Sequence, residues 1–444
     1  MDFARRAYDH SFPMDPVVRT LMDTDFYKFL MGQMIWEKHF NETATFSLHN
    51  RSASVRLAEI IDLEELRAQL DHVRSLRFRP NELIWLQGQT FYGQTGMFAP
   101  AYIDFLRRLH LPDYQLSTDP ETGQIRFETT GRWAEVTFWE IYVLSVVNEL
   151  RNRAVMRTMK RSQLDILYAR AKVKLYAKLE RLAGLESLNL TDFGTRRRHG
   201  FLWQEHCVST AREVLGDRFT GTSNAYLAMK HGLEAKGTNA HELPMALAAL
   251  CPQQDDECLK QSQYHVLQQW QNMYRGGLLV FLPDTYGTSQ FLRDAPLWVA
   301  NWTGARPDSK DPIAGGEELI AFWQRMTVDP KEKLIIFSDG MDVEIPGYRV
   351  NGSDILKVHA HFAGRVQLGF GWGTMLTNDF IGCDPINGES LKPISLVCKL
   401  TAANGHPAVK LSDNYNKAVG PAAEVERYRR IFGTEGVAEA PTRV

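Results

Sequence analysis

The 444-residue sequence predicts an α/β protein, an irregular α/β barrel preceded by an N-terminal α+β domain. From about residue 190, short apolar runs that end in polar, glycine-containing loops alternate with helical stretches, which is typical of repeated βα units around a parallel sheet. The polar residues follow the strands and do not precede them, as in a barrel whose site lies at the carboxyl ends of its strands. An open doubly wound sheet also places its ligand there, but the number of units favours the barrel.

The chain divides into three expected parts. Residues 1–145 form the N-terminal α+β domain, with residues 1–20 as a flexible arm, and residues 146–420 form the α/β-barrel domain. Residues 421–444 are a C-terminal extension.

The N-terminal part mixes helical and strand patterns. Apolar residues at helical spacing predict a helix over 23–40, opened by an Asp-Thr-Asp N-cap. Alternation predicts a strand over 42–51, and an amphipathic pattern predicts a helix over 54–76. The apolar stretch 133–150 is expected to be buried. The basic stretch 153–185 predicts a long helix with a solvated face, because it lacks the aromatic residues and motif of a nucleic-acid-binding helix.

The barrel part alternates strands and helices. Helices are predicted over 316–326 and 353–362. The segments that contain predicted strands are 277–288, 333–342, 365–374 and 393–405.

Composition and charge exclude several classes of protein. The chain is 44% hydrophobic and 23% charged, as in a soluble globular protein, and its formal net charge of −2 argues against a nucleic-acid or membrane partner. No stretch approaches the roughly 18 apolar residues of a membrane span, and the first 20 residues lack a signal-peptide pattern. We therefore expect a cytoplasmic protein.

The five cysteines are scattered and form no Cys-x-x-Cys pair. This pattern favours free thiols in a reducing compartment. A bridge between Cys251 and Cys258, beside an acidic loop, stays open as the alternative.

Two kinds of strand-end motif suggest a phosphate and sugar ligand. In the Gly-x-Gly-x-Gly loop over 368–374, residues without Cβ let backbone N–H groups converge on a phosphate, although such loops are often plain turns. The segments 304–312 and 335–342 carry carboxylates that suit ribose hydroxyls or Mg²⁺, with N-capping and turn formation as the alternative. No P-loop or dinucleotide fingerprint is present.

Three consecutive arginines, Arg196 to Arg198, follow an Asp-Phe-Gly turn, and such a cluster requires a nearby anion. The turn is not that of a protein kinase, because the other kinase motifs are missing. A second polar segment ends in His241-Glu242. A lone histidine is more often structural than catalytic, and no zinc-protease motif surrounds this one.

Taken together, these motifs resemble the nicotinate phosphoribosyltransferase family, which are type II phosphoribosyltransferases of NAD salvage. The resemblance runs from about Leu21 to Gly420. Its marks are DTDFYK at 23–28, WE at 139–140, NE at 148–149, DFGTRRR at 192–198, GTSN at 221–224, GTNAHE at 237–242, DT at 284–285, FLRD at 291–294, RPDSKDP at 306–312, FSDGMD at 337–342, FGWGTMLTND at 370–379 and VCKLTAANGHPAVKLSD at 397–413.

The resemblance implies a reaction. Nicotinate and phosphoribosyl pyrophosphate give nicotinate mononucleotide and pyrophosphate, with coupled ATP hydrolysis and Mg²⁺ held mainly through the substrate pyrophosphate. The pyridine nitrogen has a free lone pair at pH 7, so positioning and electrostatic stabilisation supply most of the catalysis.

The resemblance also implies the base and donor sites. Phe193 and Tyr27 are expected to stack on the pyridine ring, the tyrosine coming from the neighbouring subunit of a homodimer with a shared active site. Arg198 is expected to pair with a surface carboxylate. Ser223 stands where nicotinamide-using relatives carry Asp, which favours the acid as substrate. The remaining substrate contacts are Arg196 and Arg197 to anions, Arg306 to ring or phosphate, Asp308 and Asp339 to ribose, Gly371, Gly373 and Thr374 to the 5′-phosphate, and Lys399 and Lys410 to phosphate.

His241 matches the histidine that this family phosphorylates from ATP, with Glu242 expected to orient it. One departure lies in the ribose loop, where Lys310 replaces the usual glycine. A nicotinamide phosphoribosyltransferase is the nearest alternative, and the triple arginine and Ser223 argue against it. A quinolinate enzyme, a nucleic-acid-binding protein on a barrel and a catalytically idle homologue are further alternatives.

Overall fold

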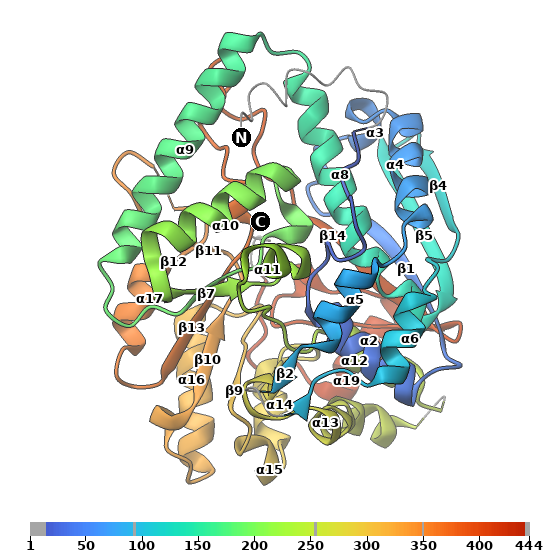
Figure 1. Cartoon of the computed structure of the whole chain (residues 1–444). Helices are drawn as coiled ribbons and strands as arrows, with labels where there is room; N and C mark the ends of the chain where they lie inside the picture. The colour runs from blue at the N-terminus through green and yellow to red at the C-terminus, as the bar shows by residue number, and fades with distance from the viewer. Residues whose placement is uncertain (1–14, 92–94, 253–254, 349, 440–444) are drawn as a thin grey trace.

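The computed structural model describes residues 15–91, 95–252, 255–348 and 350–439. The chain builds a five-stranded antiparallel sheet, in the order β15-β14-β1-β5-β4, and a six-stranded parallel sheet, in the order β7-β6-β13-β10-β9-β8. In Figure 1 the antiparallel sheet lies with helices α3 to α6 on one side, and α9, α10, α16 and α17 lie with the parallel sheet on the other. Helix α8 and strand β14 run between the two halves.

The N-terminal half differs in detail from the predicted pattern. The first described helix begins at Tyr27, because the carboxylates of Asp23 and Asp25 contact Arg198 and Ser223 and cap no helix. The predicted helix over 54–76 is two helices, since Asp62 caps a new helix through the N–H groups of Glu64 and Glu65. The bounds are α2 Tyr27–Lys38, β1 Thr43–Asn50, α3 Leu57–Ile60, α4 Leu63–Ser75, α5 Pro80–Gln87, β2 Thr90–Phe91, β3 Thr95–Gly96, α6 Pro100–Arg107, β4 Tyr114–Asp119, β5 Gln124–Arg132, α7 Trp133–Val136 and α8 Trp139–Met156.

The second half confirms the parallel α/β arrangement. Each of the pairings β7·β6, β6·β13, β13·β10, β10·β9 and β9·β8 is parallel. Within the described residues the end strands β7 and β8 are not paired with each other. The bounds are α9 Arg161–Ala183, β6 Leu190–Asp192, η1 Thr195–Arg197, α10 Phe201–Leu215, β7 Phe219–Thr222, α11 Ala225–His231, α12 Glu242–Ala249, α13 Asp256–Met273, β8 Val280–Phe281, α14 Thr288–Asp294, α15 Leu297–Ala300, β9 Gly304–Ala305, α16 Pro312–Arg325, β10 Leu334–Phe337, β11 Met341–Asp342, β12 Ser353–Asp354, α17 Ile355–Phe362, β13 Gln367–Trp372, α18 Thr374–Thr377, β14 Leu396–Ala403, β15 His406–Pro407 and α19 Ala422–Phe432.

One predicted barrel strand belongs to the other sheet. Strand β14 pairs antiparallel with β1, from Ala44 opposite Ala403 to Asn50 opposite Leu396. The chain therefore returns from the parallel half to complete the N-terminal sheet. The predicted boundary at residue 145 falls inside α8, which is buried along most of its length.

The basic helix α9 is only partly solvated. Lys174 and Lys178 are buried, and both form ion pairs with Asp379, at 3.0 Å and 2.6 Å. Lys178 also pairs with Asp342. These contacts fix α9 to the parallel half, so two of its positive charges are internal and do not belong to the predicted solvated face.

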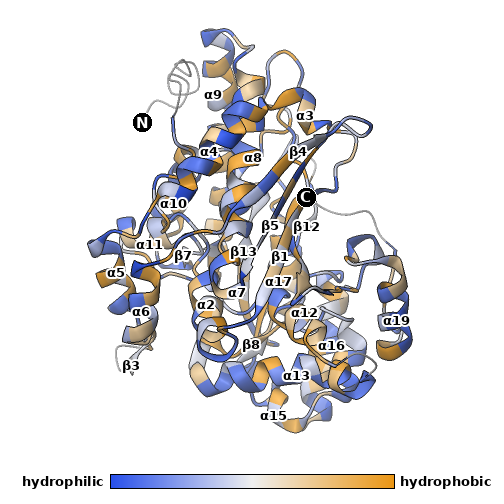
Figure 2. Ribbon diagram, turned by 90° about the vertical axis from the view of Figure 1, so that its right-hand side faces the viewer, coloured by the Kyte–Doolittle hydropathy of each residue, from blue (hydrophilic) through white to orange (hydrophobic). Residues whose placement is uncertain are grey.

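Surface helices show the expected amphipathic pattern. Figure 2 shows hydrophilic and hydrophobic residues interspersed along α4. Its buried residues Leu66, Leu70 and Val73 lie three or four positions apart and face the core. No helix of the described residues is both long and apolar enough to cross a membrane.

The cysteine prediction is wrong for one pair. Cys251 and Cys258 form a disulfide with their Cα atoms 5.9 Å apart, between the end of α12 and the start of α13. The thiols of Cys207, Cys383 and Cys398 are free and buried. Only these three therefore agree with the expected reduced state.

The predicted flexible arm is packed where the structure describes it. Val17 and Val18 are fully buried, and the N–H of Val17 donates to Oε1 of Gln69 at 2.9 Å. Residues 1–14 of the arm lie outside the described residues.

Arg198 joins this N-terminal segment to the parallel half. Its guanidinium donates two hydrogen bonds to Asp23, at 2.6 Å and 2.7 Å, and both side chains are almost completely buried. Asn224 donates to the same carboxylate at 2.8 Å. The expectation of a surface partner for Arg198 is thus wrong, since the pair is internal.

We expect Arg198→Met to lower the free energy of unfolding by about 3–5 kcal/mol, because the substitution leaves the Asp23 carboxylate buried without its cation. The exposed pair of Arg107 and Asp104 provides the control. Arg107→Met is expected to cost less than about 1 kcal/mol. Urea unfolding of both variants measures the difference, and equal costs would contradict a stabilising role for the internal pair.

Candidate active site

A cavity of about 140 Å³ lies where the parallel strands end, beside the antiparallel sheet. Residues from both halves of the chain line it. Of the predicted site residues it brings together Tyr27, Phe193, Arg196, Arg197, His241, Glu242, Arg306, Asp308, Asp339, Gly373, Thr374, Lys399 and Lys410. Ser223 and Gly371 are not among the described residues that line it.

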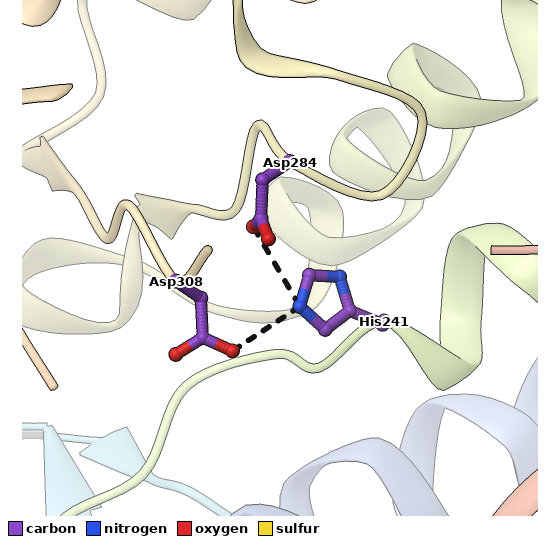
Figure 3. Close-up of side chains that lie close together, drawn as sticks. All are labelled: His241, Asp284 and Asp308. Carbon is purple, nitrogen blue, oxygen red and sulfur yellow. Dashed lines mark hydrogen bonds and ion pairs between the residues drawn. The ribbon is translucent and has the colours of Figure 1, made fainter. Parts of the chain in front are cut away.

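His241 lies at the start of α12 and faces two carboxylates (Figure 3). Its Nε2 is 3.3 Å from Oδ2 of Asp308 and 3.6 Å from Oδ1 of Asp284, and its Nδ1 is 3.0 Å from the hydroxyl of Thr285. Asp308 also accepts a hydrogen bond from Ser338 at 3.1 Å. The loop after β8 supplies Asp284 and Thr285, the loop after β9 supplies Asp308, and the loop after β10 supplies Ser338.

The electrostatics keep the imidazole neutral at pH 7. Burial lowers the pKa of His241 to about 4, against the opposing effect of Asp284. Burial alone would raise the pKa of Asp308, but the hydrogen bond from His241 and the charge of Arg306 hold it well below its ordinary value. A neutral imidazole has a free lone pair on one ring nitrogen and is able to act as a nucleophile.

Asp284 has an unused acceptor. Its side chain is fully buried, and Oδ1 has no hydrogen-bond partner among the residues that the structure describes. Oδ2 accepts a hydrogen bond from Ser309 at 2.6 Å and lies 3.6 Å from Nζ of Lys410. The cluster of His241, Asp284 and Asp308 has the spacing of a metal site, and its carboxylate oxygens are the ligand type that Mg²⁺ prefers.

Glu242 does not orient His241. Its carboxylate accepts hydrogen bonds from Trp133 and Thr137, both at 2.7 Å, and from Lys28 at 2.6 Å. These contacts point to the N-terminal half of the chain. Glu242 therefore fixes the first turn of α12 to that half and so positions the backbone of His241.

Ser223 and Gly371 have roles behind the cavity. The hydroxyl of Ser223 donates to Asp25 at 2.7 Å, and burial raises the pKa of that carboxyl. A Cβ on Gly371 would lie 2.3 Å from the ring of Phe193, so this glycine gives the ring its place against β13. The predicted direct contacts of these two residues with a substrate therefore have no support in this geometry.

Seven cationic side chains line the cavity. They are Arg51, Arg196, Arg197, Arg306, Lys399, Lys410 and Lys417. Lys417 pairs with Asp339 at 2.6 Å, and Arg51 donates to the carbonyl of Lys417 at 3.1 Å. Such a cluster suits a ligand with several negative charges.

Two aromatic residues and a glutamate form another part of the lining. Tyr27 and Phe193 both come from this one chain, and the hydroxyl of Tyr27 donates to Glu140 at 3.3 Å. The other oxygen of Glu140 lies 3.4 Å from Arg196 and 3.8 Å from Lys399. Burial raises the pKa of Glu140, but Lys28, Lys399 and Arg196 together bring it down to about 2.

Four residues of this site are not among the predicted site residues. Arg51 ends the first predicted strand, and Glu140 and Asp284 stand inside the quoted WE and DT motifs, so their motifs were a usable signal. Lys417 had none. Lys310, whose role was open, pairs with Glu318 at 2.5 Å and is not among the residues with positive φ.

The fold and the site define an α/β enzyme that binds a multiply anionic small molecule beside aromatic rings and a buried histidine. The family model of the nicotinate phosphoribosyltransferase (NAPRTase) family matches residues 188–436, and the model of its N-terminal domain matches residues 22–148. The nicotinate phosphoribosyltransferase structure from Vibrio cholerae is 29% identical, with a TM-score of 0.80, and the match covers 95% of this chain and 94% of that one. The structure of the enzyme from Porphyromonas gingivalis is 28% identical, with a TM-score of 0.76 and a coverage of 94% and 100%.

The chain belongs to the nicotinate phosphoribosyltransferase family. Its activity is the transfer of a phosphoribosyl group to nicotinate in NAD biosynthesis. The resemblance in the sequence motifs is thereby confirmed, whereas the roles of single residues remain proposals.

We expect anion binding to weaken above about pH 8. Burial lowers the pKa of Lys399 to about 8, although Glu140 raises it, so this cation loses its proton as the pH rises through that value. Calorimetric titration of nicotinate, whose own charge does not change in this range, at pH 7 and pH 9 measures the effect. The Lys399→Gln variant is expected to bind the ligand more weakly at pH 7 and to lose part of the pH dependence of binding. If the pH dependence is unchanged in this variant, another group is responsible for it.

Proposed function

We propose that the enzyme couples this transfer to ATP hydrolysis through a phosphohistidine at His241. In the transfer step the pyridine nitrogen bonds to C1 of the ribose while the bond from C1 to the pyrophosphate oxygen breaks. No proton moves in this step. The observation that carries the proposal is the placement of a neutral, buried His241 between two carboxylates and beside the cation cluster, in one cavity with the aromatic pair.

The base site is assigned to the end of the cavity with the aromatic residues. Phe193 and Tyr27 line this end of the cavity, and we assign to them the aromatic contact with the pyridine ring. Among the cations that line the cavity, Arg196 and Lys399 form ion pairs with Glu140, and we assign to them the carboxylate of nicotinate. A planar guanidinium matches a carboxylate in geometry as well as charge.

The donor site is assigned to the strand-end loops. Asp308 and Asp339 supply acceptors for ribose hydroxyls, while Gly373 and Thr374 supply the phosphate loop after β13. Arg197, Arg306, Lys410, Arg51 and Lys417 carry the charge that balances the phosphates. Positive charge held in place at a leaving pyrophosphate stabilises the transition state more than the ground state.

Phosphorylation of His241 transfers the γ-phosphoryl group of ATP to a ring nitrogen and releases ADP. The bond from phosphorus to nitrogen is later hydrolysed to phosphate, so that each cycle consumes one ATP and one water. The new negative charge lies among Asp284, Asp308 and Lys410. Asp284 and Asp308 would hold Mg²⁺, which neutralises phosphate charge and orients the phosphates.

We expect nicotinate, and not nicotinamide, to form mononucleotide with phosphoribosyl pyrophosphate and Mg²⁺. ADP release is expected to accompany product, and His241→Ala is expected to abolish it while slowing product formation by at least about tenfold, because the coupling step is lost. Parallel assays of mononucleotide and ADP, with and without ATP, measure both. ADP release that persists in His241→Ala would overturn the phosphohistidine, and turnover of nicotinamide would overturn the base-site assignment.

The subunit arrangement was expected to be a homodimer with a shared site. Tyr27, the residue expected from the neighbour, lines the cavity of its own chain and bonds to Glu140 of that chain. We infer that one chain supplies a complete site.

Dilution is therefore expected to leave the specific activity unchanged from micromolar to nanomolar enzyme. Activity measured against concentration, alongside sedimentation to record the oligomeric state, checks this. A fall in specific activity that follows dissociation would restore the shared site.

A further inference from the structure

A lysine outside the cavity holds two of the carboxylates that line it. Lys28, on α2, is fully buried. Its Nζ lies 2.7 Å from Oε2 of Glu140, 2.6 Å from Oε2 of Glu242 and 3.1 Å from the hydroxyl of Thr137. An ammonium group has three N–H donors, so all of them are used within the protein.

Glu140 faces the cations that are assigned to the substrate carboxylate. One of its oxygens points to Lys28, and the other lies near Arg196 and Lys399. Glu140 therefore competes with an incoming carboxylate for these two cations. Without Lys28, the full charge of Glu140 would act on the base site.

We propose that Lys28 determines the preference for an anionic pyridine substrate, because its pairing with Glu140 and Glu242 leaves Arg196 and Lys399 available to the carboxylate of nicotinate. Lys28 is a positioning residue, and the proposal rests on the base site assigned above. Its effect is electrostatic: one buried positive charge offsets one of the two buried negative charges that face the cavity.

A purely structural role makes a different prediction. Glu242 keeps its hydrogen bonds from Trp133 and Thr137 when Lys28 is removed, so α12 stays attached to the N-terminal half. If Lys28 served only for folding, its loss would affect every substrate equally. An electrostatic role affects nicotinate above all.

The test compares Lys28→Met, Glu140→Gln and the double variant, with KM values for nicotinate and for phosphoribosyl pyrophosphate. We expect Lys28→Met to raise the KM for nicotinate about tenfold or more. The KM for phosphoribosyl pyrophosphate is expected to change by less than about threefold. Glu140→Gln is expected not to raise the nicotinate KM. The double variant is expected to return to within about threefold of the wild type, because the competing charge is also gone.

Lys333→Met is the matched control. Lys333 is buried and donates to the carbonyl of Trp302 at 2.8 Å, at the amino end of β10 and so opposite the strand ends that form the site. Its nicotinate KM is expected to equal that of the wild type. Thermal unfolding of every variant records the loss of stability separately.

Each outcome decides the proposal. A proportional rise of both KM values in Lys28→Met, or no recovery in the double variant, would overturn it. If Lys28→Met does not fold, Glu140→Gln still decides, because a raised nicotinate KM in that variant contradicts competition by Glu140. A wild-type enzyme without nicotinate turnover would instead overturn the function itself.

Discussion

The pairing of β14 with β1 is the constraint on which the site depends. This antiparallel contact brings residues 396–403 back to the N-terminal sheet and sets Lys399, on β14, beside Glu140 of α8. The same sheet brings Arg51, at the end of β1, to the cavity. The carboxyl ends of the parallel strands close the cavity from the other side. A parallel sheet alone would supply the loops of the donor site, but not the side of the cavity that β1, β14 and α8 form.

Two sets of buried ion pairs lie around this side of the cavity. The sets Arg198–Asp23 and Lys28–Glu140–Glu242 are internal, and each joins the N-terminal half to the parallel half or to the cavity. Buried ion pairs contribute little net stability compared with apolar replacements, but removal of one partner is costly. Their presence near the site therefore indicates a positional use: they fix charged side chains where a multiply anionic substrate must bind.

Burial and neighbouring charges act in different ways on His241 and on Glu140. Burial keeps His241 neutral, which suits a nucleophile, while the cations around Glu140 keep that residue ionised. The proposed base site thus contains the negative charge of Glu140, which Lys28 offsets from outside the cavity. In the proposed base site, selectivity for an acid over an amide depends on the charges of Lys28, Glu140, Arg196 and Lys399. Ser223 is not among the residues that line the cavity.

The sequence by itself determined the family, the parallel α/β arrangement and most of the cavity lining, because motifs at strand ends meet at one edge of a parallel sheet. It also pointed to His241, Arg196 and Arg197, which the structure brings together in one cavity. Only the tertiary structure decided where β14 pairs, since strand alternation does not say which sheet accepts a strand. It likewise decided that Glu242 bonds to Lys28 and that Ser223 bonds to Asp25, because contacts between residues about 200 positions apart leave no local pattern. Periodicity fixes which face of an element is apolar, whereas the partner of a buried charge depends on the packing of distant elements.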